Sequence, residues 1–100
     1  MLHTINKSPF GSVSLKTCLG LARKGSDILL IEDGVYGALS GTEYSDVLGA
    51  ALKDMNVYAL GPDLRARGIQ EDRIIEGIRV VDYKGFVELT VVNDKVQSWL

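Results

Sequence analysis

The segment Ile28–Ala38, with the sequence ILLIEDGVYGA, constrains the fold of this chain more than any other feature. Branched apolar residues follow one another without polar alternation and stop at two carboxylates and a glycine. A run this short is typical of a strand buried on both faces, as in a parallel sheet covered by helices. Functional crevices in such sheets lie outside the carboxyl ends of the strands. We therefore expect Glu32, Asp33 and Gly34 at the edge where a site would form.

Strand-like and helix-like segments alternate along the whole chain. Short apolar or β-branched runs predict strands at 1–6, 28–31, 57–60, 78–81 and 96–99. Apolar residues at helical spacing predict helices over 12–24, 43–53 and 83–92, and a shorter helix opens at Gly61-Pro62-Asp63 and ends at Gly68. Strands separated by helical crossovers indicate an α/β fold. We predict one three-layer α/β/α domain over residues 1–100, with a five-stranded, mainly parallel sheet.

Charge and cysteine content exclude several classes of protein. Eleven basic against thirteen acidic residues give a net charge of −2, which argues against direct nucleic-acid or membrane binding. The single cysteine, Cys18, excludes an intramolecular disulfide and fits a reducing compartment. No signal peptide or apolar run of membrane-spanning length is visible in the sequence. These features predict a cytoplasmic protein.

Neither a cofactor nor a metal ion is expected from the motifs. The glycines form neither of the two glycine-rich phosphate-loop patterns. Glu32 and Asp33 have no second acidic or histidine cluster to complete a metal shell. His3, the only histidine, lies among apolar neighbours and is more typical of a core residue than of a base.

Several stretches together resemble the DsrH/TusB family. They are MLHTINKSPF, ILLIEDGVYGAL, VYALGPDLRARG, VVDYKGFVELT and VQSWL, which follow in this order over nearly the whole chain. The resemblance implies a DsrEFH-like α/β domain that forms a cytoplasmic hexamer with DsrE/TusD-like and DsrF/TusC-like subunits. Such a complex passes sulfur as a cysteine persulfide to a small carrier, DsrC or TusE.

The end of the third predicted strand departs from the catalytic subunit of such a complex. There, the sulfur-carrying cysteine lies just before a short helix, whose N–H groups favour an anion. This chain has Gly61, Pro62 and Asp63 at that place, and no cysteine. The resemblance therefore implies an accompanying subunit and not the catalytic one.

Cys18 has two interpretations. Its spacing with Leu15, Leu19 and Ala22 places it on the core side of a helix, where a cysteine is a small, unreactive hydrophobe. Alternatively, it lies at an open edge and acts as a catalytic or sulfur-carrying thiol. A cysteine in this first helix also resembles DsrH more than TusB, which favours sulfur oxidation over thiolation of the tRNA wobble uridine.

The remaining candidates belong to the crevice or to an interface. Glu32 and Asp33 would form a pocket edge, a cation site or a turn, with Asp33 as a helix cap and Gly34 supplying an unusual dihedral angle. Lys7 and Tyr36 would line the crevice or an interface. Arg65 and Arg67, on a short helix next to the crevice, would be solvated or would face an acidic patch on a partner. Trp99 would pack on the sheet edge, across a subunit boundary or into the core.

Overall fold

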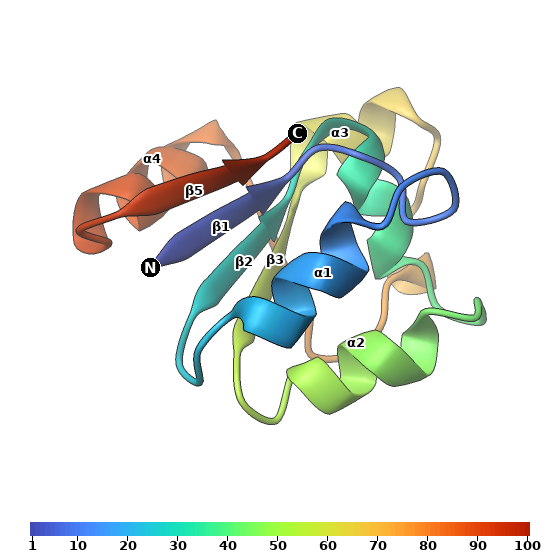
Figure 1. Cartoon of the computed structure of the whole chain (residues 1–100). Helices are drawn as coiled ribbons and strands as arrows, with labels where there is room; N and C mark the ends of the chain where they lie inside the picture. The colour runs from blue at the N-terminus through green and yellow to red at the C-terminus, as the bar shows by residue number, and fades with distance from the viewer.

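The computed structural model describes residues 1–100 and contains a five-stranded sheet in which every pairing is parallel. The strand order is β4-β3-β2-β1-β5 (Figure 1). The strands are β1 (Leu2–Ile5), β2 (Asp27–Leu30), β3 (Asn56–Leu60), β4 (Arg79–Val81) and β5 (Val96–Trp99). The predicted α/β class and the strand positions are confirmed.

Helical segments connect the strands. They are α1 (Ser14–Leu21), η1 (Glu32–Ala38), α2 (Ser45–Ala51), α3 (Gly61–Ala66), η2 (Glu71–Arg73) and α4 (Tyr83–Val92), where η marks a 3₁₀ helix. The predicted helices over 12–24 and 43–53 are both too long. In α1, Ala22 is already extended, with ψ at 138°, so the helix ends at Leu21, four residues before Gly25. None of these helices has the length and apolar character needed to cross a bilayer.

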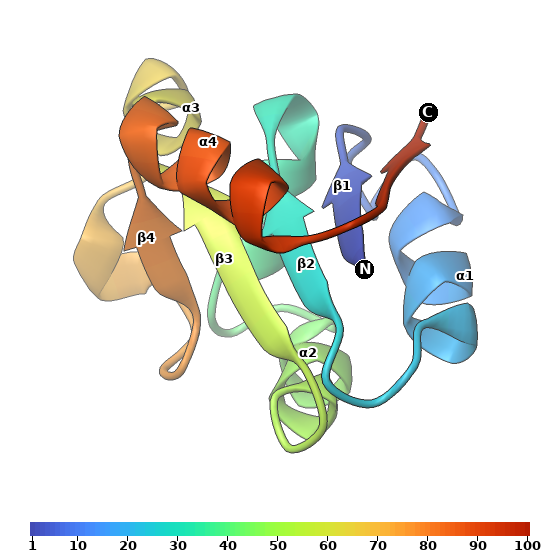
Figure 2. The same ribbon diagram turned by 90° about the vertical axis from the view of Figure 1, so that its left-hand side faces the viewer.

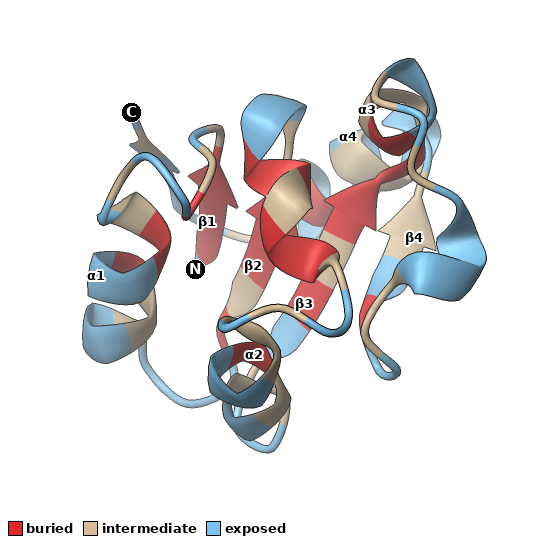
Figure 3. Ribbon diagram, turned by 90° about the vertical axis from the view of Figure 1, so that its right-hand side faces the viewer, coloured by how far each residue is buried: buried red, intermediate tan, exposed pale blue.

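The two faces of the sheet differ in how deeply they are covered. Helices α1 and α2 and the 3₁₀ segment η1 pack on one face over a core of twelve buried residues, and Figure 3 shows their buried sides turned toward the strands. The other face is covered by α4, over a cluster of only Leu2, Leu29 and Leu89 (Figure 2). Strand β2 is buried on both faces, because Ile28, Leu29 and Leu30 have no exposed surface.

Helix α4 shields one face of the sheet and leaves its own outer side apolar. Tyr83, Val87 and Val91 recur every four residues along it, and each is more than half exposed. Residues at this spacing lie on one side of a helix. The structure thus leaves an apolar stripe on α4.

Candidate functional site

The chain reverses sharply at the carboxyl end of β2. The N–H of Ile31 donates to the carbonyl of Ile5 at 2.9 Å, and Gly34 then passes directly against the same carbonyl group. A β-carbon on Gly34 would overlap the Ile5 oxygen and lie 2.9 Å from its carbonyl carbon. The prediction that Gly34 supplies an unusual dihedral angle is wrong. Glu32 adopts the positive φ, at 50°, and Gly34 is required for close approach.

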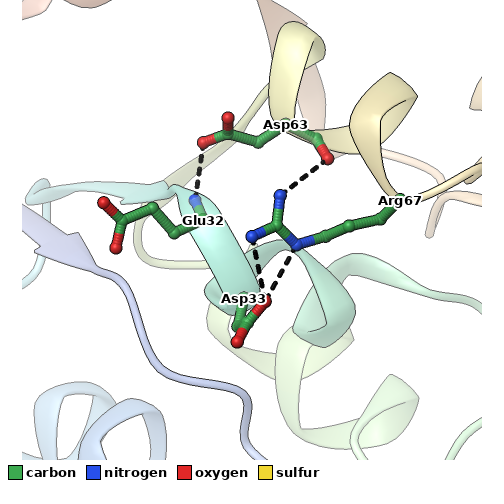
Figure 4. A network of polar contacts seen from close by, with 4 residues as sticks. All are labelled: Glu32, Asp33, Asp63 and Arg67. Carbon is green, nitrogen blue, oxygen red and sulfur yellow. Dashed lines mark hydrogen bonds and ion pairs between the residues drawn. The ribbon is translucent and has the colours of Figure 1, made fainter.

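A polar network joins this turn to α3 (Figure 4). The N–H of Glu32 donates to Asp63 Oδ2 at 2.6 Å, which satisfies the backbone of the strained residue. The guanidinium of Arg67 donates from Nε to Asp33 Oδ1 at 2.9 Å, and its Nη2 lies 2.9 Å from the same oxygen. Its Nη1 donates to the carbonyl of Asp63 at 3.2 Å. The network fastens η1 to the helix that follows β3.

This arrangement pairs one of the two carboxylates predicted to be functional, that of Asp33, and leaves the Glu32 carboxylate unpaired. Asp33 caps no helix, because the N-cap of η1 is Ile31 and η1 has no side-chain cap. Its carboxylate is engaged with Arg67, and the Glu32 side chain makes no hydrogen bond within the chain. No group of three histidine, cysteine or acidic residues is placed to hold a metal ion. The polar groups at the carboxyl edge therefore hold η1 and α3 together, as a structural crosslink does.

The end of β3 has no cysteine, and the space around Gly61 is small. Gly61 is buried, and a β-carbon there would lie 3.2 Å from both Arg65 Nη1 and a methyl group of Val80. Pro62 occupies the first turn of α3, where it removes an N–H donor. Neither the space nor the full set of donors that would favour a thiolate is present.

Cys18 lies on the buried side of α1. It has no exposed surface and packs in the main cluster with Leu15 and Ile28. Burial raises the pKa of the Cys18 thiol from an ordinary value of 9.0 to about 11. Cys18 therefore has the environment of a small hydrophobe, as its helical spacing predicts.

The other predicted site residues are not brought together. Lys7 is exposed in the loop after β1, Tyr36 is half-buried in η1, and Arg65 is exposed on α3. No hydrogen bond or ion pair joins them to one another or to Glu32. Of the two arginines expected beside the crevice, Arg67 reaches the carboxyl edge, two residues beyond Arg65.

Trp99 is docked at the sheet edge and packs against the main core cluster. Its Nε1–H donates to His3 Nδ1 at 3.1 Å, so His3 is a hydrogen-bonded core residue. Burial, and then the nearby positive N-terminal amine, lower the pKa of His3 below its ordinary 6.5. The neutral ring is the form that accepts from Trp99.

A groove missed by sequence reasoning opens beside this pair. It has a volume of about 620 Å³ and lies between the amino ends of β1 and β5 and the segment after α1. Arg23, Lys24 and Lys95 line it together with His3 and Trp99, and no carboxylate does. These residues come from separate segments, and only the Arg23-Lys24 pair is adjacent in sequence.

The fold and the site define a small three-layer α/β protein whose carboxyl edge is crosslinked internally. The chain belongs to the DsrH-like family, since the family model described as "DsrH like protein" matches residues 7–96. It is similar to Protein TusB of Escherichia coli O1:K1 / APEC, with 39% identity over 99 residues that cover 99% of this chain and 100% of that protein. Protein TusB of Photorhabdus laumondii is 37% identical over 102 residues, with the same coverage.

Solved structures share the fold. The ychN protein from E. coli superposes with a TM-score of 0.82 at 22% identity, covering 97% of each chain. Protein MTH1491 from Methanobacterium thermoautotrophicum gives 0.76 at 19% identity, covering 97% of this chain and 96% of that chain. At this identity the likeness establishes architecture only, and the family membership makes the chain a sulfur-relay subunit.

Proposed function

We propose that the chain is a structural subunit of a cytoplasmic sulfurtransferase complex that relays persulfide sulfur to a DsrC/TusE-type carrier. Its expected partners are a DsrE/TusD-like and a DsrF/TusC-like subunit in a heterohexamer. Family membership supports the sulfur-relay role. A persulfide relay also suits the reducing cytoplasm, where thiols persist.

The apolar stripe of α4 is the observation that carries the assembly role. Tyr83, Val87 and Val91 form it, and Val92 and Val96 extend the exposed apolar surface beside it. A contiguous exposed apolar surface marks an interaction site. Helix α4 alone covers a cluster of only three buried residues on its face of the sheet. A homologous subunit that packs on α4 would therefore also bury more apolar surface on that side.

Two features support a structural role over a sulfur-carrying one. A persulfide carrier needs an accessible thiolate, whereas Cys18 is fully buried and its pKa is raised to about 11. The end of β3 offers Gly61 and Pro62 and no thiol. In this proposal the reactive cysteine belongs to another subunit.

The pathway we favour is 2-thiouridine synthesis at the tRNA wobble position. Relatives at 37–39% identity over the full length carry the name TusB. The second candidate is sulfur oxidation, which the cysteine in α1 favours by resemblance to DsrH. Because a buried cysteine can be replaced by other small apolar residues, the presence of Cys18 is weak evidence for either pathway.

Affinity purification of the tagged chain from its native cytoplasm tests the assembly role. We expect recovery of two homologous small α/β proteins, identified by mass spectrometry, one with a cysteine after its third strand. V87D with V91D places two charges on the stripe and should abolish recovery of at least one of them while the chain stays folded.

The matched control is V13D, since Val13 is exposed at the N-terminus of α1, far along the chain from the stripe. V13D should purify with the same partners as the wild type. Recovery of the wild-type chain alone, or equal recovery with V87D/V91D, would contradict the proposed interface.

A further inference from the structure

The groove between β5 and the end of α1 concentrates positive charge in a protein of net charge −2. Arg23 and Lys95 have no ion-pair partner in the chain. Lys24 approaches Asp54 at 3.8 Å, but both side chains are more than half exposed, so this pair neutralises little of its charge. The side chains that line the groove include no carboxylate.

Part of the groove lining is apolar and aromatic. Met1, Leu21 and Trp99 supply it, and Trp99 is held in place by its hydrogen bond to His3. Burial, and then the positive N-terminal amine, lower the pKa of His3, and no carboxylate lies in the groove lining beside it. A ligand that fits must combine negative charge with apolar surface.

The open edge of β5 indicates that the ligand is an extended peptide. It pairs only with β1 and ends the sheet, so its outer backbone groups have no strand partner. The carbonyl of Lys95 accepts from the N–H of Leu2, and carbonyl directions alternate along a strand. The carbonyl groups of Val96 and Ser98 therefore point away from β1, where an added strand would lie.

An added strand would carry its side chains over the groove. Gln97 and Trp99 lie on the groove side of β5, in register with His3 and Ile5. Alternate side chains of a neighbouring strand would project on the same side, toward Arg23 and Lys95. Backbone pairing and charge complementarity thus point to the same occupant.

We propose that this groove and the open edge of β5 together bind an extended acidic segment of a partner protein as an additional strand. The main support is that unpaired cations lie beside an open strand edge. This binding does not depend on the sulfur-relay assignment. The chemical class of the occupant is a β-strand with carboxylates at alternate positions.

The full chain contains one tryptophan and one histidine, and both line the groove, so binding has two unambiguous readouts. The probe is a blocked pentapeptide of alternating glutamate and valine. We expect a saturable change in Trp99 fluorescence and a rise in the pKa of His3 measured by NMR. A peptide with lysine in place of glutamate should not bind.

Two further arms separate backbone pairing from simple anion binding. An acidic peptide that is N-methylated at every residue keeps the charge but loses all of its backbone N–H donors, and should bind at least about fivefold more weakly. Inorganic phosphate at equal ionic strength should not saturate either signal. Equal binding of the N-methylated peptide, or saturation by phosphate, would overturn the proposal in favour of a free-anion site.

Charge variants test the residues named. R23Q with K95Q should weaken binding of the acidic peptide about tenfold or more, an effect typical of lost charge complementarity. K53Q with K84Q removes the same charge from exposed residues outside the groove and should leave binding unchanged. Absence of binding to the wild type, or equal losses in both pairs, would refute the site.

Discussion

The carboxyl edge of the sheet and the groove at its amino end differ in whether their charged side chains have partners within the chain. At the carboxyl edge, Asp33 and Arg67 satisfy each other, and Asp63 secures the strained backbone of Glu32. In the groove, Arg23 and Lys95 are left unpaired beside an open strand edge. In sheets of this kind a site is expected at the carboxyl ends of the strands, yet here internal contacts crosslink the part of that edge that follows β2. Charged groups that have no partner within the chain lie in the groove.

The two regions also differ in how much of their surface is taken up by contacts within the chain. Gly34 lies in close contact with the Ile5 carbonyl of β1, and Arg67 links α3 to η1, so structural contacts occupy the space directly after β2. The exposed stripe on α4 and the groove are two surfaces that stay open for partners. The following predictions test this division, from the largest expected effect to the smallest.

Substituting Gly34 should have the largest effect. G34A places a methyl group on the Ile5 carbonyl and should lower the free energy of unfolding by about 3 kcal/mol or more, measured by urea denaturation. The control is G20A, because a β-carbon on Gly20 in α1 meets nothing within 4 Å. G20A should stabilise the protein by roughly 0.5–1 kcal/mol. A G34A protein as stable as the wild type would contradict the close approach.

Labelling of Cys18 should be strongly suppressed. Raising the thiol pKa from 9.0 to about 11 lowers the thiolate fraction near neutral pH about a hundredfold, before burial slows the reaction further. Iodoacetamide should therefore modify native protein far more slowly than protein in denaturant. Because the raised pKa favours the folded state below pH 9, stability should fall as the pH rises from 9 toward 11. Rapid labelling of the native chain would indicate an exposed thiol.

Removing the guanidinium of Arg67 should loosen the carboxyl edge. R67Q loses the bonds to Asp33 and to the carbonyl of Asp63, which should cost about 1 kcal/mol of stability. R65Q is the matched control on the same helix, since Arg65 is exposed and has no ion-pair partner. Equal stability of the two variants would show that the network contributes nothing.

Acidification should have the smallest effect, and it acts on the groove. Because the pKa of His3 is lowered in the folded state, its contribution to stability is present above pH 6.5 and is lost as the pH falls below that value. Protonation also removes the acceptor of Trp99, so its fluorescence should change over the same range. H3Q should abolish this dependence. An unchanged pH profile in H3Q would place the titrating group elsewhere.

The fold could be predicted from the sequence because it rests on local patterns. The apolar run at Ile28–Leu30 predicts a strand buried on both faces, and Pro62 marks the start of α3. The helix positions follow from apolar spacing, although α1 ends early at Ala22. The membership of Cys18 in the core also follows from helical spacing.

The sites were harder to predict because they depend on contacts between distant segments. Arg67 reaches Asp33 across 34 positions, and Trp99 reaches His3 across 96. The role of Gly34 depends on where the Ile5 carbonyl lies, which no local pattern encodes. The groove combines residues from both ends of the chain with the pair after α1, so its charge is invisible in any single stretch.

The central claim is that this chain supports a sulfur relay without carrying sulfur. The most direct test loads the purified native complex with a ³⁵S-labelled persulfide donor and locates the label by non-reducing peptide mapping, with C18S complex alongside. We predict label on a cysteine of another subunit, none on Cys18, and equal transfer to the carrier in C18S. Label on Cys18, together with loss of transfer in C18S, would contradict the account.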